Sequence, residues 1–226
     1  MSSFKKSDLH LNWASYQAAQ YACGKWHYSK SMPTGKLIKI GVWEKEKFVG
    51  CVIFSRGSNY CMPQKYGLTQ KTCCELTRVA LASHRSPVSR IVSIAFAFLK
   101  KSSPSIQLVV SYADPYQNHH GGIYQAGNWI YVGTSGSSYE YYYRGRWVHS
   151  KVAYEAHKYD PNASKSLLES RIKEGKHIYL MPLNSQMKKK ALSLAQPYPM
   201  RSKQVQVSPT DTDGGAAPTR TLQKLT

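Results

Sequence analysis

One segment of the chain, residues 73–133, restricts the possible folds more than any other. Two short runs within it, "TCCELTRVALAS" and "IQLVVSYA", are rich in apolar residues, which predicts strands. Between them, "VSRIVSIAFAFLKK" follows Pro87 and carries apolar residues at i, i+3 and i+4, which predicts a helix. A strand, a crossover helix and a second strand in this order predict an α/β fold.

Antiparallel strands are predicted before this crossover. Residues 37–42 and 48–54 are apolar runs that flank a turn at 44–47, which is the pattern of a hairpin. A helix is expected at about residues 12–23, a short helix before Trp129, and further strands at "NWIYVGTS" and "YEYYYRGRWVHS". The whole order predicts a mixed, mainly antiparallel sheet with flanking helices.

A single domain is expected over residues 1–196, with its core at about 12–158. The weaker pattern of residues 159–196, with "SKSLLESRIKEG" and "QMKKKALSLA", predicts a basic helical extension. Residues 197–226 are rich in Pro, Ser, Thr and Gly without an apolar pattern, and we expect a disordered tail. No apolar run approaches ~20 residues, so no membrane-spanning helix is expected, and the start "MSSFKKSDLH" lacks the apolar core of a signal peptide. Five cysteines without zinc-site spacing are typical of reduced thiols in a cytoplasm.

The charge of the chain favours a polyanionic partner. Lys and Arg number 31 against 12 Asp and Glu, which gives +19. Residues 1–196 hold 27 basic and 10 acidic residues, so +17 of this charge lies outside the tail. Seventeen tyrosines accompany the cations, and aromatic rings mixed with cations suit bases and phosphates. Nucleic acid is therefore the expected partner, with mere solubility as the alternative.

Residues 111–133, "SYADPYQNHHGGIYQAGNWIYVG", crowd polar groups between two apolar runs. Asp114 ends a predicted buried strand, where an isolated carboxylate would be costly. It therefore needs a partner such as a metal, an amine of a base or a backbone amide. As the residue before Pro115 it could instead simply stabilise a turn. The crowding favours a functional site.

Residues of about 36–149 resemble the GNAT acyltransferase superfamily. The resemblance implies that the strand before the central helix, the start of that helix and the next strand form a cleft for an acyl-CoA-type donor such as acetyl-CoA. The residues that match the superfamily's second cofactor-contacting helix are Asn118, Gly121 or Gly122, Ile123, Tyr124 and Gly133.

A more specific resemblance is to the Mom DNA-modification proteins of Mu-like phages. It is carried by "HYS" at 27–29, "ELTRVAL" at 75–81, "SR" at 89–90, "SYAD" at 111–114 and "GxIYQAxNWxYxG" at 121–133. It implies an enzyme that acts on double-stranded DNA in the cytoplasm of a bacterial host. That enzyme would convert adenine, at its exocyclic amine, to a carbamoylmethyl derivative that protects phage DNA from restriction. The alternatives are a conventional acetyltransferase of protein or aminoacyl-tRNA and an inactive basic DNA-binding protein. A homodimer is left open.

The resemblance implies catalytic roles for His27, Tyr28, Asp114 and Tyr124. His27 would act in acid–base chemistry or bind a metal, Asp114 would accept the proton of the amine, and Tyr124 would act as general acid. A loop histidine, a packed Tyr28, a turn aspartate and a core tyrosine are the structural alternatives.

Arg78 completes the expected catalytic set. Glu75 is three residues away, on the opposite face of an ideal strand, so Arg78 is expected to meet a phosphate or a substrate carbonyl. A structural ion pair across strands is the alternative.

The donor site is expected at the start of the central helix. The resemblance implies donor contacts from Arg85, Ser89, Arg90 and Asn118, although Ser89 could instead form only a first-turn hydrogen bond. The stretch "SHRSPVSR" lacks the glycines of the usual GNAT turn, so an unusual donor is the alternative.

A metal is a further hypothesis for the site. His27, Asp114 and His119 would form a set of histidine and carboxylate ligands that suits iron.

Overall fold

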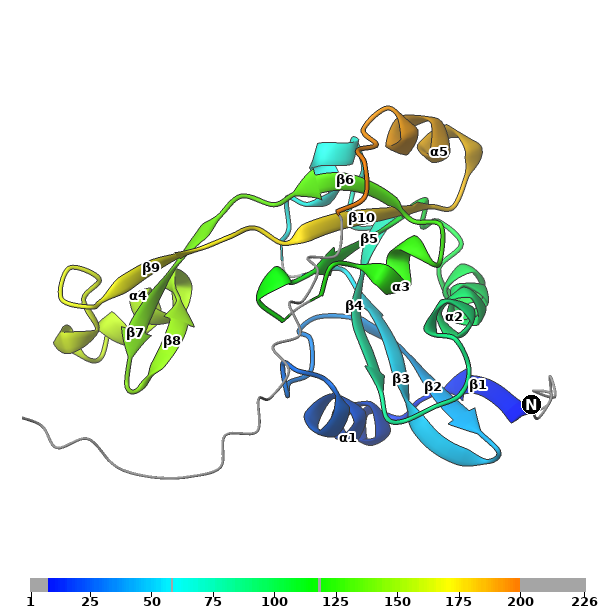
Figure 1. Ribbon diagram of the computed structural model, residues 1–226, viewed down its shortest axis with the longest axis horizontal. Helices are drawn as coiled ribbons and strands as arrows, with labels where there is room; N and C mark the ends of the chain where they lie inside the picture. The colour runs from blue at the N-terminus through cyan, green and yellow to red at the C-terminus, as the bar shows by residue number, and fades with distance from the viewer. Residues whose placement is uncertain (1–7, 58, 118, 200–226) are drawn as a thin grey trace, which may run out of the picture.

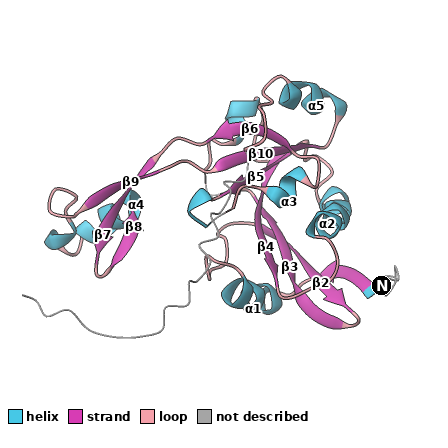
Figure 2. Ribbon diagram, in the orientation of Figure 1, coloured by secondary structure: helices cyan, strands magenta, loops and turns pink. Residues whose placement is uncertain are grey.

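The computed structural model describes residues 8–57, 59–117 and 119–199. Two sheets, one large and one small, are joined by two extended connections (Figure 1, Figure 2). The strands of the large sheet are β1 (Leu9–Trp13), β2 (Leu37–Glu44), β3 (Lys47–Ser55), β4 (Cys73–Leu81), β5 (Leu108–Ala113), β6 (Ile130–Thr134) and β10 (His177–Pro182). Those of the small sheet are β7 (Ser138–Tyr143), β8 (Arg146–His149) and β9 (Ser170–Lys173). The helices are α1 (Tyr16–Trp26), α2 (Val88–Ser102), α3 (Gly122–Gln125), α4 (Ser150–His157) and α5 (Ser185–Leu192). Short 3-10 turns are η2 (Pro63–Tyr66), η3 (Pro115–Gln117) and η4 (Pro161–Ala163).

The large sheet confirms the expected mixed, mainly antiparallel architecture. Its order is β1-β2-β3-β4-β5-β10-β6, and β4 and β5 form its parallel pair. The apolar stripe of α2 packs with Phe54 and Leu76 on one face. On the other face, Ala19 and Cys23 of α1 pack with Ile53, while α5 packs with β10. Helices therefore flank the sheet on both sides, because both faces of its central strands are apolar.

The parallel strands β4 and β5 pair over only three residues and then separate. The pairing runs from Cys73–Leu108 to Glu75–Val110, although both strands continue beyond it. The later part of β4 pairs with β3 alone, and the later part of β5 pairs with β10. This separation opens a gap in the middle of the sheet, beside α3 (Figure 1).

A β-bulge changes which residues of β4 share a face. Ile53 pairs with Arg78 but the next residue, Phe54, pairs with Leu76, so Thr77 is an extra residue in the ladder. Because one inserted residue reverses the alternation, Glu75 and Arg78 lie on the same face of the sheet. The expectation that these two side chains lie on opposite faces is therefore wrong.

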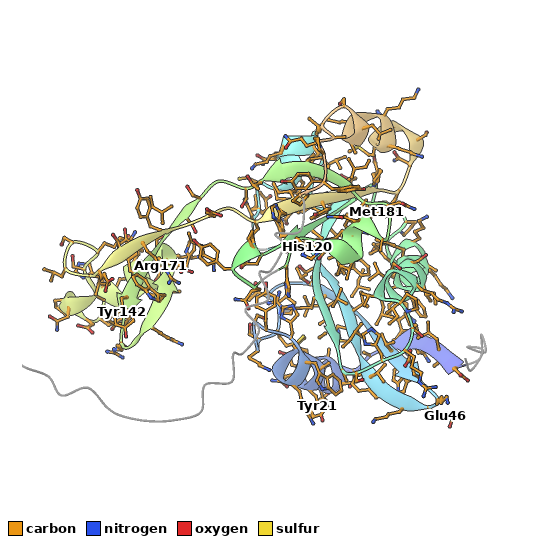
Figure 3. All side chains as sticks on the ribbon, viewed as in Figure 1. Tyr21, Glu46, His120, Tyr142, Arg171 and Met181 are labelled. Atoms are coloured by element: carbon orange, nitrogen blue, oxygen red, sulfur yellow. The ribbon has the colours of Figure 1, made fainter. Side chains whose placement is uncertain are left out.

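The small sheet projects from the large one between β6 and β10 (Figure 1). Its order is β8-β7-β9, and α4 packs against β7 and β8. Tyr142 and Arg171 lie on this sheet in Figure 3, far from Glu46 at the tip of the β2–β3 hairpin.

Three local expectations are corrected by the structure. The helix expected at 12–23 is α1, shifted to 16–26, and the residues before it form β1. The stretch "YEYYYRGRWVHS" is not one strand but a hairpin, since Arg144 and Gly145 adopt positive φ angles of 49° and 77° in a two-residue turn.

The predicted basic helical extension at 159–196 is the third correction. It contains β9 and β10 as well as α5. The apolar residues of β10 fill the space between β5 and β6, which a surface helix would leave empty. In the described part of the chain, no helix has the length and apolar character needed to cross a membrane. The expected disordered tail falls largely on residues 200–226, outside the described residues.

Candidate active site

Two cavities lie on either side of the gap between β4 and β5. The first, of about 670 Å³, lies between α2 and α3, and we call it the α2 cavity. The second, of about 830 Å³, lies between the large and small sheets, and we call it the inter-sheet cavity. Ile123 and Tyr124 line both cavities, so α3 forms the wall that separates them.

The Tyr124 hydroxyl is held in the gap by a chain of hydrogen bonds. Ser111 Oγ lies 2.8 Å from the carbonyl oxygen of Leu76 on β4 and 2.8 Å from the hydroxyl oxygen of Tyr124. Because serine has a single hydroxyl proton and a carbonyl can only accept, Ser111 donates to Leu76 and Tyr124 donates to Ser111. Burial raises the pKa of Tyr124 to about 12, so the phenol stays protonated.

Gly121 explains why α3 can approach β10 so closely. Its φ is +83°, and a Cβ atom at this position would overlap the ring of Tyr179. The Tyr179 hydroxyl donates a 2.7 Å hydrogen bond to the carbonyl oxygen of His120. The Gly121–Gly122 pair of the sequence therefore sets the position of the Tyr124 wall.

His27 and Tyr28 line the inter-sheet cavity, as expected of site residues. The Nδ1 atom of His27 accepts a 3.1 Å hydrogen bond from the amide of Ser29, so the ring proton lies on Nε2. Burial, and then the charges of Arg78, His119 and nearby lysines, lower the pKa of His27 to about 4. His27 is therefore a neutral hydrogen-bond donor. The ring of Tyr28, which is 43% exposed, lies 4.4 Å from the His27 ring and offers a flat stacking surface.

Arg78 and Glu75 lie together in the same cavity as a result of the bulge. The Arg78 guanidinium donates to the carbonyl oxygens of Ser31 and Thr77, at 3.2 and 2.8 Å, which leaves further N–H groups for a ligand. Within the described residues no hydrogen bond reaches the Glu75 carboxylate. Burial raises the pKa of Glu75, against the opposing charges of Arg78 and Lys176. The sequence alone predicted Glu75 on the face opposite to Arg78, because an extra residue in a strand leaves no pattern.

Asp114 is buried but does not line either cavity. One of its oxygens accepts a hydrogen bond from the amide of Tyr116, and the other lies 3.7 Å from Lys173 Nζ and 3.5 Å from Lys176 Nζ. Lys173 is the last residue of β9 and Lys176 lies in the β9–β10 connection, and both lysines line the inter-sheet cavity. The partners of Asp114 are thus a backbone amide, as expected, and two cations that sequence reasoning missed.

The expected metal set is not formed by the described residues. In residues 8–57, 59–117 and 119–199, no group of three or more His, Cys, Asp or Glu side chains is placed to hold a metal ion. His27 and His119 both line the inter-sheet cavity, but the Asp114 oxygens face lysines instead. The iron hypothesis therefore has no support in this arrangement.

The α2 cavity contains two of the four residues expected at the donor site. Ser89 and Arg90 line it at the start of α2, where Pro87 provides no side-chain cap and the first amides of the helix are available. Trp129 and Phe96 supply an apolar floor. This combination fits a ligand with an anionic end and an apolar arm.

Arg85 lies elsewhere, and its loop is already occupied by a carboxylate. The Glu44 side chain accepts hydrogen bonds from the amides of Arg85 and Ser86, at 2.8 and 2.7 Å, and Pro87 has no amide hydrogen. Three consecutive positions before α2 therefore offer no donor to a pyrophosphate. The loop does not fit the usual phosphate cradle of an acyl-CoA, although the cavity fits its arm. Asn118 lies outside the described residues.

The sequence model of the Mom protein family matches residues 8–200 of the chain. The chain belongs to the Mom protein family. A curated relative, the methylcarbamoylase mom of Escherichia phage Mu, is 28% identical over 127 residues, which are 54% of this chain and 52% of that protein. The match therefore spans about half the length of this relative.

Two solved acetyltransferases share a distant structural likeness with the chain. A putative acetyltransferase from Acinetobacter baylyi has a TM-score of 0.44 and 11% identity, and covers 79% of this chain and 94% of its own. The ribosomal-protein-S5-alanine acetyltransferase from Vibrio fischeri has a TM-score of 0.44 and 9% identity, and covers 82% and 98%.

Proposed function

We propose that the chain is a DNA-modification enzyme that converts adenine, at its exocyclic amine, to the carbamoylmethyl derivative. Membership in the Mom family and the name of the Mu relative, a methylcarbamoylase, support this reaction. In this proposal the donor occupies the α2 cavity and the adenine enters the inter-sheet cavity. The modification would protect phage DNA from host restriction nucleases.

One observation carries the proposal: two cavities on opposite faces of the sheet meet at Ile123 and Tyr124. A group transfer needs two substrates whose reacting atoms touch while the rest of each stays apart. The gap between β4 and β5 provides such a meeting point. Among the described residues, Ser111, Leu76 and Tyr124 fix its walls by hydrogen bonds.

The side chains of the inter-sheet cavity suit a flipped adenine. Its volume of about 830 Å³ accommodates a nucleoside, and the half-exposed Tyr28 ring can stack on the base. The Nε2–H group of His27 and the guanidinium of Arg78 can donate hydrogen bonds to the ring nitrogens of adenine or to negative charge that develops during the transfer. Asp114 then acts through Lys173 and Lys176, which it holds at the cavity for contact with phosphates.

The charge of the chain and the open face of the small sheet support DNA as the partner. Side chains that share this face with the cavity residues Glu140 and Lys173 are Tyr142, Trp147 and Arg171. The Arg171 guanidinium lies 4.3 Å from the centre of the Trp147 ring. Cations stacked with exposed aromatics form a surface for phosphates and unstacked bases. With a net charge of +19, DNA affinity should fall steeply with salt.

Nucleoside mass spectrometry of DNA from bacteria that express the chain tests the proposed function. The expected result is a carbamoylmethyl-adenine peak that is absent from cells carrying an empty vector. The same DNA should resist restriction nucleases whose sites contain adenine. Unmodified adenine, together with acetylated protein or aminoacyl-tRNA, would contradict the proposal and indicate a conventional acetyltransferase.

A further inference from the structure

We propose that Glu75 is the group of the inter-sheet cavity that accepts the hydrogen bond, and then the proton, of the exocyclic amine of adenine. This inference rests on the proposed function and deepens it. Nothing in the family match assigns a role to Glu75. The position of its side chain follows from the bulge at Thr77, which turns it into the cavity beside Arg78.

The surroundings of Glu75 distinguish it from the other carboxylates nearby. Asp114 is engaged by Lys173, Lys176 and the amide of Tyr116, while Glu140 is engaged by Arg171 and Lys173. Glu174 also lines the cavity, but it is exposed to solvent.

Glu75 is partly buried, and none of the described residues donates a hydrogen bond to its carboxylate. A carboxylate in such a place loses part of its hydration, so a ligand that supplies a donor would stabilise it. An amine is the donor that the proposed substrate brings.

The backbone at Gly57 encloses the Glu75 carboxylate from one side. Gly57 has a φ of +79°, and a Cβ atom there would lie only 2.8 Å from Glu75 Oε2. Lys176 and Arg78 act on the carboxylate through their charges, and the charge of Glu75 in turn contributes to the raised pKa of Tyr124. Glu75 therefore lies close to the wall at which the two cavities meet.

His27 is not suited to accept the proton. Its Nδ1 atom already accepts the amide hydrogen of Ser29, and its Nε2 atom carries a hydrogen. The low pKa of His27, about 4, also makes it a weak base. Glu75 has the opposite properties, since burial raises its pKa and strengthens it as a base.

In the proposed step, the exocyclic amine of adenine attacks a donor that carries an electrophilic carbon and a leaving group. The lone pair of the amine nitrogen forms the new N–C bond. The bond between that carbon and the leaving group breaks, and its electron pair departs with the leaving group. One N–H proton moves to Glu75, which becomes neutral. Loss of such a base costs typically 10²–10⁴-fold in rate.

Glu75→Gln tests the proton transfer, because the amide keeps the shape and can still accept a hydrogen bond but is not a base. We expect 10²–10⁴-fold less modified adenine per cell. Glu46→Gln makes the same change at the distant tip of the β2–β3 hairpin (Figure 3) and should leave modification unchanged. Substantial modification by Glu75→Gln would overturn the inference. No modification by the unaltered chain would instead overturn the proposed function.

A binding measurement tests the recognition of the amine separately from activity. The probes are a single-stranded deoxyadenosine oligonucleotide and the same oligonucleotide with 2′-deoxynebularine, which lacks only the 6-amino group. We expect the unaltered chain to bind the first about tenfold more tightly, as the loss of a hydrogen bond to a charged group predicts. Glu75→Ala should reduce this ratio to about one. Equal affinities in the unaltered chain, or an unchanged ratio in Glu75→Ala, would overturn the inference.

Discussion

The two sheets differ in what stabilises them. In the large sheet, β3 is buried along nearly its whole length, and residues such as Phe54 and Ile53 are fully enclosed between helices. In the small sheet, the buried positions include the charged Glu140, which forms ion pairs with Arg171 and Lys173 on the neighbouring strand. Apolar burial therefore dominates in the large sheet, whereas the small sheet, which buries Val148 against α4, also relies on ion pairs and aromatic contacts at its surface.

This difference gives the inter-sheet cavity two unlike walls. A wall made of apolar core can hold Glu75 and Arg78 in fixed positions, since it tolerates little movement. A wall made of ion pairs can present cations and rings to a charged ligand, and it can adjust at low cost. The two kinds of wall face each other across the cavity.

Removal of an aromatic ring from the core of the large sheet should lower the stability of the protein most. Phe54→Ala should lower the free energy of unfolding by about 3–5 kcal/mol, because Phe54 is 1% exposed and packs against Phe96. Trp147→Ala in the small sheet should lower the free energy of unfolding by about 1 kcal/mol, since the Trp147 ring contacts the exposed side chains of Arg171 and Tyr142. Urea unfolding of both variants measures the contrast. Equal losses would show that the small sheet has a core of its own.

An intermediate effect is expected from acid on the small sheet. Burial alone would raise the pKa of Glu140, but hydrogen bonds and charges of Arg171 and Lys173 outweigh it and lower the pKa below its usual value. A lowered folded-state pKa means that the stabilisation is present above the unfolded pKa and is lost as pH falls through the folded one. Hydrogen exchange of the β7 amides, corrected for its intrinsic pH dependence, should therefore accelerate below about pH 4.

The control for this prediction is Glu140→Gln, which has no carboxylate to titrate. Its β7 amides should exchange faster at neutral pH and should lack the additional acceleration in acid. The amides of β3 should show neither change. A β7 exchange rate that is insensitive to both acid and Glu140→Gln would contradict the ion-pair account of the small sheet.

The smallest effect is expected from the C-terminal residues. The chain past α5 lies along β6, where the Gln196 amide donates to Tyr131 and the Tyr198 hydroxyl donates a 2.5 Å hydrogen bond to the carbonyl oxygen of Trp129. Deleting residues 200–226 should leave the melting temperature unchanged. Deleting 197–226 removes the Tyr198 bond and should cost about 1 kcal/mol. A large loss from the shorter deletion would show that residues beyond 199 contribute to the fold.

Strong local patterns made the centre of the fold predictable. The hairpin at 37–54, the strands around Val79 and Val110, and the helix after Pro87 have apolar runs that agree with their final burial. The turn at Arg144 and Gly145 also has a sequence signal, because a glycine-containing pair separates two stretches rich in aromatic residues. One long strand was nevertheless the expectation there. That error lies in the interpretation and not in the sequence.

Other features had no local signal. The apolar run of β10 is short, and it becomes a strand by pairing with β5 and β6, which lie many residues earlier in the chain. The lysines that meet Asp114 are about sixty positions away from it and come from that same region. The bulge at Thr77 leaves the composition of β4 unchanged, so alternation assigned Glu75 to the wrong face. Tyr124 and His27 were predicted at the site and do line the cavities, whereas their catalytic roles stay predictions.

The place of β10 also dictates a sequence of events during protein synthesis. The strand lies between β5 and β6, yet its last residue is made 69 positions after the end of β5 at Ala113. At ~5–20 residues per second, that interval lasts roughly 3–14 s. Throughout it, β5 presents an unpaired edge to other nascent chains, which is a hazard for aggregation. Slow codons between residues 113 and 182 would lengthen this exposure, so the yield of folded protein should depend on translation speed there.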